Sequence, residues 1–219
     1  MELRVEHATG SAADFHGREL PFDNRLVVWH FAVDGPAIVL GSRQRDHVLE
    51  LAACREAGVE VVHRRSGGGL VYLEPGGALW VDVVVPATDR RSIADVRGSM
   101  EWMGEQWVEA LRRVGWSDGV VMHRGGLEGS SWSELVCFAG IGPGEVLLDG
   151  RKLVGISQRR TRSAARFQCA VHLRPTSIDV LGLLTPPLPP AGDLPEVAVL
   201  DAGVAALLVD ALVDVLAAA

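Results

Sequence analysis

The chain contains little cysteine and no cysteine pair. Its 219 residues include three cysteines, Cys54, Cys137 and Cys169, at wide spacing. An odd number of cysteines without a Cys-x-x-Cys motif predicts neither a disulfide framework nor a zinc site. We therefore expect no metal bound by protein ligands, and a reducing, cytoplasmic location.

Excess positive charge and uninterrupted apolar runs are also lacking. The net charge of −7 argues against nucleic acid as the main partner. Residues 1–6 alternate charged and apolar side chains and lack a signal-peptide core. The apolar stretch at 197–219 is interrupted by Asp201, Asp210 and Asp214, which would be costly inside a bilayer. We expect no membrane span, but a C-terminal helix over 196–217 docked on the protein.

No internal repeat or long linker divides the sequence. Prolines concentrate in residues 185–195, a segment too short to mark a domain boundary. The composition, 48% hydrophobic and 22% charged, is typical of a soluble globular protein. We predict a single domain over residues 1–219.

Strand and helix patterns alternate along this domain. Strands are predicted at residues 26–33, 37–40 and 59–63, with a helix at 46–57 ended by Gly58. Residues 70–73 and 79–85 resemble a hairpin, and 92–114 shows a clear helical period that begins with Ser92 and Asp95. Asp149-Gly150 predicts a type I′ turn between strands at 146–148 and 152–157, and 167–173 is a further strand. The fold class is α+β, with a mixed, mostly antiparallel sheet flanked by helices.

A glycine-rich segment follows the strand at residues 59–63. It reads Arg64-Arg65-Ser66-Gly67-Gly68-Gly69 and continues to Val71. Because glycine costs conformational entropy, we expect the three glycines to serve the approach of backbone to a ligand rather than packing or stability. Exposed N–H groups beside two arginines would bind an anion. A mobile surface loop is the alternative from spacing alone.

Lys152 follows the predicted tight turn and begins an apolar strand. Alternation would place it on one face with Val154 and Ile156, and Gly155 on the other. A lysine on such a face would provide a fixed positive charge for a carboxylate or phosphate. A solvated lysine at a strand end is the alternative.

The two segments together resemble the lipoate-protein ligase A family, within the lipoate/biotin protein ligase and octanoyltransferase superfamily. Arg-Arg-Ser-Gly-Gly-Gly-x-Val-Tyr precedes Gly-Arg-Lys-x-x-Gly-x-x-Gln, and upstream Trp29, Pro36, Gly41 and Gln44 also match. The resemblance covers roughly residues 26–175. It implies the fold of that superfamily's catalytic domain.

The resemblance also implies an activity and a set of site residues. The chain would attach lipoate or octanoate to a lysine of a lipoyl carrier domain through an acyl-adenylate, using ATP and magnesium. Lys152 would be the catalytic cation, and Arg64 would contact the carboxyl or phosphate end. The binding residues would be Arg64, Ser66, Gly67, Gly68, Gly69, Val71, Gly155 and Ser157.

Departures from the family pattern leave a rival open. Gly144-Glu145 stand where ligases usually have Asn-Asp, and Cys169-Ala170 where they have His-Gly, with His172 displaced. Cys137-Phe138 before Glu145 resembles a branch of octanoyltransferases that work through a cysteine thioester without ATP. In that hypothesis Cys137 is the nucleophile; otherwise it packs as a small apolar residue.

A basic run follows the lysine strand. Arg159, Arg160, Arg162 and Arg166 form either a solvated loop or a docking surface for an acidic lipoyl domain. Because the family pattern is eroded, a non-catalytic acyl-binding or accessory protein is the remaining alternative. Acyl transfer to a lipoyl domain would distinguish the two classes.

Overall fold

The fold is built on a large, mostly antiparallel sheet. A computed structural model describes residues 3–21 and 24–219. Its seven-stranded sheet has the order β1-β2-β6-β10-β9-β8-β7. β1 and β2 run parallel and every other neighbouring pair is antiparallel, as predicted. The strands are β1 Arg4–Gly10, β2 Val27–Val33, β6 Ala78–Pro86, β10 Ala164–His172, β9 Arg151–Arg160, β8 Val146–Leu148 and β7 Val120–Met122.

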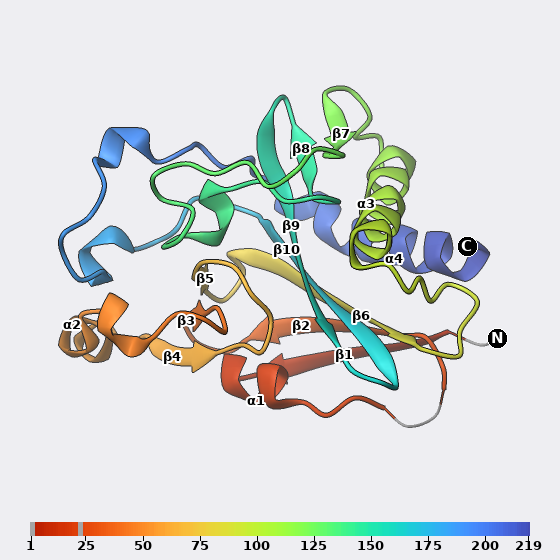
Figure 1. The fold of residues 1–219 in the computed structure, drawn as a ribbon, viewed down its shortest axis with the longest axis horizontal. Coiled ribbons are helices and arrows are strands. Elements are labelled where there is room, and N and C mark those ends of the chain that lie inside the picture. Colours follow the sequence, from red (N-terminus) through yellow and green to blue (C-terminus); the bar gives the residue numbers. More distant parts are fainter. Residues whose placement is uncertain (1–2, 22–23) are drawn as a thin grey trace.

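A three-stranded sheet of order β4-β3-β5 lies beside one end of the large sheet (Figure 1). It comprises β3 Ala37–Leu40, β4 Glu60–His63 and β5 Val71–Leu73, with the short helices α1 Ala12–Gly17 and α2 Leu51–Glu56 alongside. Apolar residues of both sheets and of α1 form one core, which includes Phe15, Trp29, Phe31 and Trp80. The two sheets are therefore held together by a packed apolar layer.

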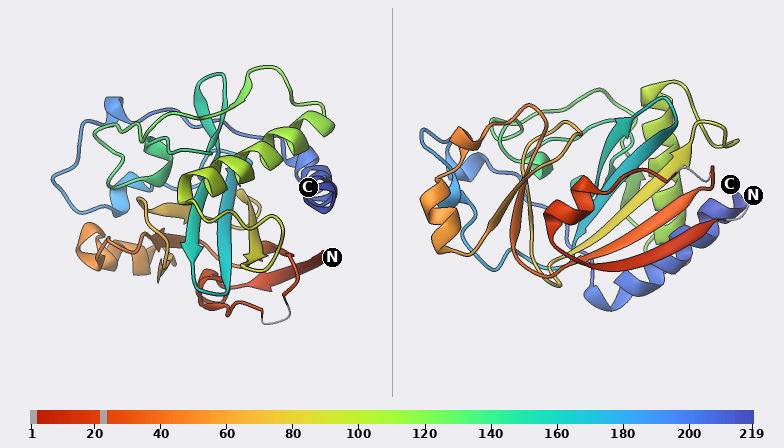
Figure 2. Two further views of the ribbon diagram at one scale, coloured as in Figure 1. Left: turned by 45° about the vertical axis from the view of Figure 1, so that its right-hand side comes forward. Right: turned by 90° about the horizontal axis from the view of Figure 1, so that it is seen from below.

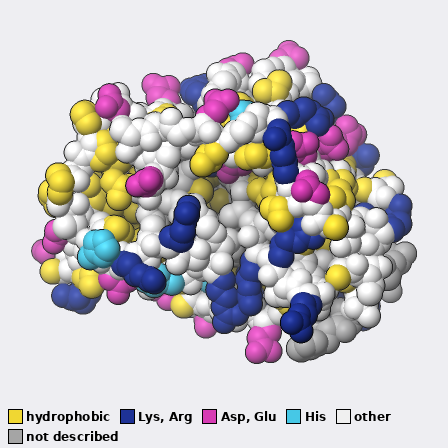
Figure 3. Space-filling view, in the orientation of Figure 1, with side chains coloured by type: hydrophobic (Ala, Val, Ile, Leu, Met, Phe, Trp, Pro, Cys, Tyr) yellow, Lys and Arg dark blue, Asp and Glu magenta, His cyan; other side chains and the backbone are white. Residues whose placement is uncertain are grey.

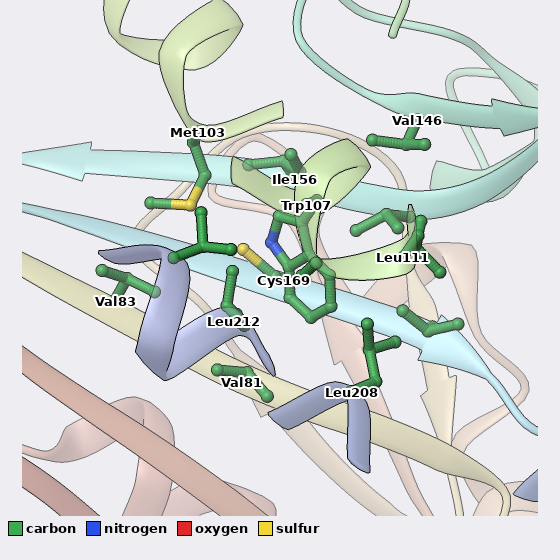
Figure 4. Close-up of a cluster of buried hydrophobic side chains, with 14 of the residues drawn as sticks. Val81, Val83, Met103, Trp107, Leu111, Val146, Ile156, Cys169, Leu208 and Leu212 are labelled. Atoms are coloured by element: carbon green, nitrogen blue, oxygen red, sulfur yellow. The ribbon is translucent and has the colours of Figure 1, made fainter. Parts of the chain in front are cut away.

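Two long helices cover the opposite face of the large sheet (Figure 2). They are α3 Val96–Arg113 and α4 Ala202–Ala218, which also pack on each other. Met103, Trp107 and Leu111 of α3 meet Leu208 and Leu212 of α4 over strands β6 and β10 (Figure 4). No helix in the described part of the chain has the length and apolar character that crossing a membrane requires.

Four short 3-10 segments complete the elements. They are η1 Asp46–Val48, η2 Cys137–Ala139, η3 Leu181–Leu183 and η4 Ala191–Asp193. The predicted helix at residues 46–57 is in fact η1 followed by α2. The break arises because Leu49 pairs with Leu184 and the Glu50 N–H donates to the carbonyl of Leu183.

The predicted hairpin at residues 70–85 is wrong. β5 pairs with β3 in the small sheet, whereas β6 lies between β2 and β10 in the large one. The turn after Glu74, closed by the Gly77 N–H on the Glu74 carbonyl, carries the chain from one sheet to the other. Alternating apolar residues at both strands are equally compatible with either arrangement.

Both long helices begin later than predicted. α3 begins at Val96 because Asp95 is its N-cap, accepting from the Gly98 N–H at 2.5 Å. α4 begins at Ala202 with Asp201 as N-cap, so residues 196–201 are extended. An aspartate at the N-cap marks each of these starts. Strands β1 and β7 and helix α1 were not predicted at all.

Candidate active site

The glycine segment joins β4 to β5 and is fixed from within by Arg64. This side chain is buried, and its Nη2 donates to the carbonyls of Gly67 and Gly69, each at 2.8 Å. Gly68 has φ +100°, a conformation that L side chains rarely adopt. Arg64 thus holds carbonyl oxygens inward, and its guanidinium is used by the loop rather than left free for a ligand.

Glycine is required at some positions of this segment because a side chain would clash, but not at others. A Cβ at Gly69 would lie 2.7 Å from the carbonyl carbon of Val136, and one at Gly41 would lie 1.8 Å from the Gly68 oxygen. A Cβ at Gly67 would meet nothing within 4 Å. The expectation that none of these glycines serves packing is therefore wrong for Gly69, while Gly67 has open space beside it.

A second loop is fastened to the glycine segment and brings Cys137 to it. Gln44 Nε2 donates to the carbonyls of Glu134 and Leu135, each at 3.0 Å, and its Oε1 accepts from the Gly41 N–H. The Cys137 N–H donates to the Leu70 carbonyl at 2.9 Å. As a result, Cys137 Sγ is 3.4 Å from the position of a Cβ on Gly68.

A β-bulge turns Lys152 toward this loop. Val146 pairs with Val154 but Leu147 pairs with Lys152, so Leu153 is an extra residue on β9. Paired residues share a face, so Lys152 lies opposite to Val154 and on the side of Gly155, where a Cβ would be 3.3 Å from Lys152 Cε. The predicted face shared by Lys152, Val154 and Ile156 is therefore wrong at Lys152. The Asp149-Gly150 turn itself has the predicted positive φ values, 50° and 77°.

Lys152 is buried and its three N–H donors all have partners. Nζ lies 2.6 Å from Glu145 Oε1 and donates to the carbonyls of Cys137 at 2.9 Å and Gly140 at 3.0 Å. Glu145 also accepts from the N–H groups of Ile156 and Gly142. This buried pair is an organising element of the site, and a ligand that binds Lys152 must replace one of its partners.

One cleft contains both predicted segments. Gly67, Gly68 and Gly69 line it from one side and Lys152 from the other, and Cys137 and Ser157 also face it. Its volume is about 1110 Å³. Figure 3 shows Lys and Arg side chains around the middle of the corresponding face of the molecule.

Further cations reach this cleft, and of these the sequence indicated only Arg160, as part of a docking surface. Arg43, Arg97 and Arg160 line it, Arg97 from the start of α3. Arg160 donates to the Ile93 carbonyl at 2.6 Å, and Gln158 Nε2 donates to Ser99 Oγ at 3.0 Å. Gln158 Oε1 has no hydrogen-bond partner among the described residues. The approach of α3 to β9 brings Arg97 and Arg160 together, and Arg43 reaches the cleft from the loop after β3.

A narrow apolar slot runs between the two sheets and opens from the cleft. Cys137, Ile156 and Ser157 line both spaces. The slot wall consists mainly of apolar side chains and also includes Arg64, Val71 and Gly155 of the predicted site. Every predicted site residue except Ser66 therefore faces either the cleft or the slot. Its remaining apolar lining residues are Val39, Leu73, Trp80, Phe138, Cys169 and Ala170.

Ser66 instead anchors a chain of polar side chains at the slot. Its Oγ donates to Gln168 Oε1 at 2.9 Å and lies 3.0 Å from Ser157 Oγ, while Gln168 Nε2 is 3.0 Å from His16 Nδ1. Burial, with Arg166 and Arg64 nearby, lowers the pKa of His16 to about 3. His16 is therefore neutral at pH 7; since Nδ1 accepts from Gln168, Nε2 carries the proton.

The remaining candidate residues lie away from the cleft. Cys169 faces the α3–α4 core, where burial raises the pKa of its thiol, so it is not a nucleophile. Arg166 is buried, with Nη2 2.6 Å from Asp82, and is a structural residue rather than part of a basic docking surface. His172 stacks edgewise on Phe138 at 4.5 Å. Arg162 is exposed, as the docking hypothesis requires.

Solved structures of lipoate-protein ligases share this fold. The putative lipoate protein ligase Ta0514 of T. acidophilum with bound lipoic acid has a TM-score of 0.67 and 18% identity, over 99% of this chain and 84% of that one. A lipoate-protein ligase A bound with ATP has a TM-score of 0.67 and 16% identity, over 100% and 85%. At such identities the similarity shows the fold alone. No curated protein matches the chain in sequence.

The fold and the cleft thus define a class, the catalytic domains of the lipoyl protein ligase type. Residues 19–189 match the family model of the lipoyl protein ligase A/B catalytic domain. The chain belongs to this family and is an enzyme of the lipoate-protein ligase type.

Proposed function

We propose that this enzyme attaches a lipoyl or octanoyl group to a lysine of a lipoyl carrier domain through an acyl-adenylate. The observation that carries the proposal is the junction of a cationic cleft with an apolar slot at Cys137, Ile156 and Ser157. Such a shape suits a molecule with a charged nucleotide end and an apolar acyl end. The structure of a bipartite lipoate protein ligase and its E2 lipoyl domain from Thermoplasma acidophilum, 17% identical with a TM-score of 0.67 over 100% of this chain and 83% of that one, is consistent with such a carrier.

The residues of the cleft match the charge changes of this reaction. The acyl carboxylate attacks the α-phosphorus of ATP and pyrophosphate leaves; the carrier amine then attacks the acyl carbonyl and AMP leaves with the acyl-oxygen bond electrons. Two anions meet in the first step, and fixed cations with backbone donors lower their repulsion. Lys152, Arg43, Arg97 and Arg160 are the cations that line the cleft.

Magnesium would enter this cleft with the nucleotide phosphates. Protein-bound Mg²⁺ usually keeps several waters and takes one or two carboxylates together with phosphate oxygens. Among the described residues no group of three His, Cys, Asp or Glu side chains could hold a metal alone. Asp95 and Glu134 line the cleft and would be the carboxylates for this mode of binding, because Glu145 is held by Lys152.

A second candidate function rests on the position of Cys137. Its side chain lines both slot and cleft, next to the glycine loop. In an octanoyltransferase the Cys137 thiolate would attack a carrier-bound thioester and release the carrier thiol; the target lysine would then attack the Cys137 thioester. This route needs no ATP.

The test is acyl transfer to a purified lipoyl domain, measured by intact mass. One reaction contains free lipoate or octanoate with ATP and magnesium, and the other contains octanoyl bound to an acyl carrier protein without ATP. We expect a mass increment on the lipoyl domain in the first reaction. Transfer in the second alone would select the thioester route, and transfer in neither would support a non-catalytic binding protein.

A further inference from the structure

A second apolar cavity lies behind the slot and is not used by the chemistry described above. Its volume is about 350 Å³, against about 40 Å³ for the slot. Side chains from β5, η2, the end of β10 and the segments after it enclose it, among them Tyr72, His172, Ile178 and Val180. Both spaces are lined by Phe138 and Val71, so these two residues form the wall between them.

The other end wall of the slot is rigid. His16 stacks on Trp80 with ring centroids 4.6 Å apart and is bonded through Gln168 to Ser66. Trp80 Nε1 donates to the buried Asp82 at 2.7 Å. Behind these residues lies the packed core of Phe15 and Phe31, which leaves no room for a longer ligand.

Phe138 forms a different kind of wall. Its ring lies against Gly155, where a Cβ would be 3.0 Å away, against the edge of His172, and 5.1 Å from Lys152 Nζ. A phenylalanine side chain has no hydrogen bond to hold it, and space lies directly behind it. Phe138, together with Val71, thus closes the slot by its bulk and without a hydrogen bond.

We propose that Phe138 is the residue that limits acyl chain length in this enzyme, by closing the slot against the second cavity. This proposal rests on the proposed function, because it assumes that the acyl chain occupies the slot. An apolar cavity of about 150 Å³ suffices for a six-carbon ring such as benzene. The second cavity, once joined to the slot, therefore has room for at least about four more carbons.

The experiment compares binding and transfer of straight-chain fatty acids of about six to sixteen carbons. Binding is measured by thermal shift and calorimetry with the acids themselves, and transfer by intact mass of a lipoyl domain. In the wild type we expect both to decline above a limiting chain length, at which the end of the chain meets Phe138. In Phe138→Ala we expect the preferred length to rise by at least about four carbons, with binding of the longer acids strengthened at least about tenfold relative to octanoate.

Two further variants separate a specific effect from general loosening. In the Phe138→Ala/Ile178→Trp double variant, the indole refills the cavity from the segment after β10, and the wild-type length limit should return. Ile178→Trp alone should leave the wild-type length profile unchanged, because the chain does not pass Phe138. Phe138→Met, which preserves bulk, should also keep the wild-type limit.

Three results would overturn the proposal. They are an unchanged length profile in folded Phe138→Ala, a shift that Ile178→Trp does not reverse, and a shorter limit in Ile178→Trp alone. If the wild type binds fatty acids but transfers none, the proposed function fails while the binding profile still tests Phe138.

Discussion

The two faces of the large sheet use the same strands for different purposes. Along β10, Phe167, Cys169 and Val171 point to the α3–α4 side and are fully or almost fully buried among apolar residues. Their neighbours Arg166, Gln168 and His172 point to the small-sheet side. β6 alternates in the same way, with Val81 and Val83 facing the helices.

This difference between the two faces shows where the protein keeps buried polar and charged side chains. A buried polar group destabilises a protein unless it is hydrogen-bonded, so a face with many of them needs a partner for each. On the small-sheet side Arg166 pairs with Asp82, Gln168 with Ser66, and Lys152 with Glu145. The helix-covered face mainly stabilises the fold, whereas the small-sheet face contains buried polar groups that lower stability and form the site.

Lys152→Ala should produce the largest effect, and it should lower both acyl transfer and the free energy of unfolding. We expect transfer to fall by about a thousandfold or more, because a fixed cation in the cleft is lost. A lysine that lines a cleft would be expected to contribute little to folding, but Lys152 is buried and paired, and its loss leaves Glu145 without its cation. Breaking a buried ion pair costs about 3–5 kcal/mol. Single-turnover transfer and chemical denaturation measure the two effects.

A double variant separates stability from catalysis at this position. Lys152→Met/Glu145→Gln removes both charges, keeps the bulk, and should recover much of the lost unfolding free energy. It should remain inactive. Recovery of near-native transfer in the double variant would show that Lys152 acts only through the structure.

Leu212→Ala tests whether the helix-covered face contributes to stability but not to acyl transfer. Leu212 is fully buried under α4, so its truncation should lower the free energy of unfolding by about 2–5 kcal/mol. Leu207 lies on the same helix with 61% of its surface exposed, and Leu207→Ala is the matched control with little expected change. Transfer per folded molecule should stay near wild type in both. A selective loss of transfer in folded Leu212→Ala would contradict the division between faces.

Much of the fold could be predicted because periodicity reports burial. The helix α3 and the β8–β9 hairpin each have a strong pattern and clear boundary residues. The pairing of strands could not be predicted in the same way: β5 and β6 alternate like a hairpin yet enter different sheets. Alternation identifies a strand and its buried face, but its neighbours depend on the rest of the fold.

Site residues could be predicted from the sequence where they belong to a motif within one short segment. The Arg64–Gly69 segment and Lys152 were found, and they line one cleft together with Cys137. His16 and Gln168 were missed as contributors, because each reaches the site from an element outside the two segments, whereas Arg160 was expected only in a docking surface. The bulge that turns Lys152 was also missed, since an extra residue on one strand leaves no mark in its sequence.

The glycine loop allows packing to be separated from ligand binding within three residues. Gly67→Val adds a side chain in open space, so stability should change little while affinity for an acyl-adenylate analogue falls about tenfold or more. Gly68→Val should lose binding and stability together, since it has positive φ and faces Arg64. Calorimetry with the analogue and thermal melts provide both measurements. Unchanged affinity in Gly67→Val would mean that no ligand approaches this loop.

Acid should destabilise the small-sheet side through its histidines. The pKa of His16 is lowered to about 3 by burial, and that of His172 to about 4 by burial and Lys152. Both stay neutral in the folded state while the unfolded chain binds protons below about pH 6.5. Stability is therefore complete above that pH and falls as the pH drops toward the folded pKa. For His16 the loss is about 2 kcal/mol between pH 7 and pH 5. In thermal melts at both pH values, His16→Gln should lose less stability between pH 7 and pH 5 than the wild type. An equal loss in both proteins would show that His16 is not the cause.

Cys137→Ser should have the smallest effect if the acyl-adenylate route holds, although Cys137 occupies the junction of slot and cleft. Serine nearly matches cysteine in size, and the contacts that fix this segment are made by the backbone, through the Cys137 N–H and carbonyl. Transfer with ATP and magnesium should stay within a few-fold of wild type.

In the thioester route the same substitution is lethal, because an unactivated hydroxyl is a far weaker nucleophile than a thiolate at neutral pH. Wild type would then also carry an acyl mass increment that hydroxylamine removes. Cys54→Ser, at a buried helical position remote from the cleft, is the matched control for the loss of a thiol. We favour the adenylate route because the open space at Gly67 and the several cations that line the cleft suit a nucleotide phosphate. ATP-independent transfer that disappears in Cys137→Ser and survives in Cys54→Ser would overturn this choice.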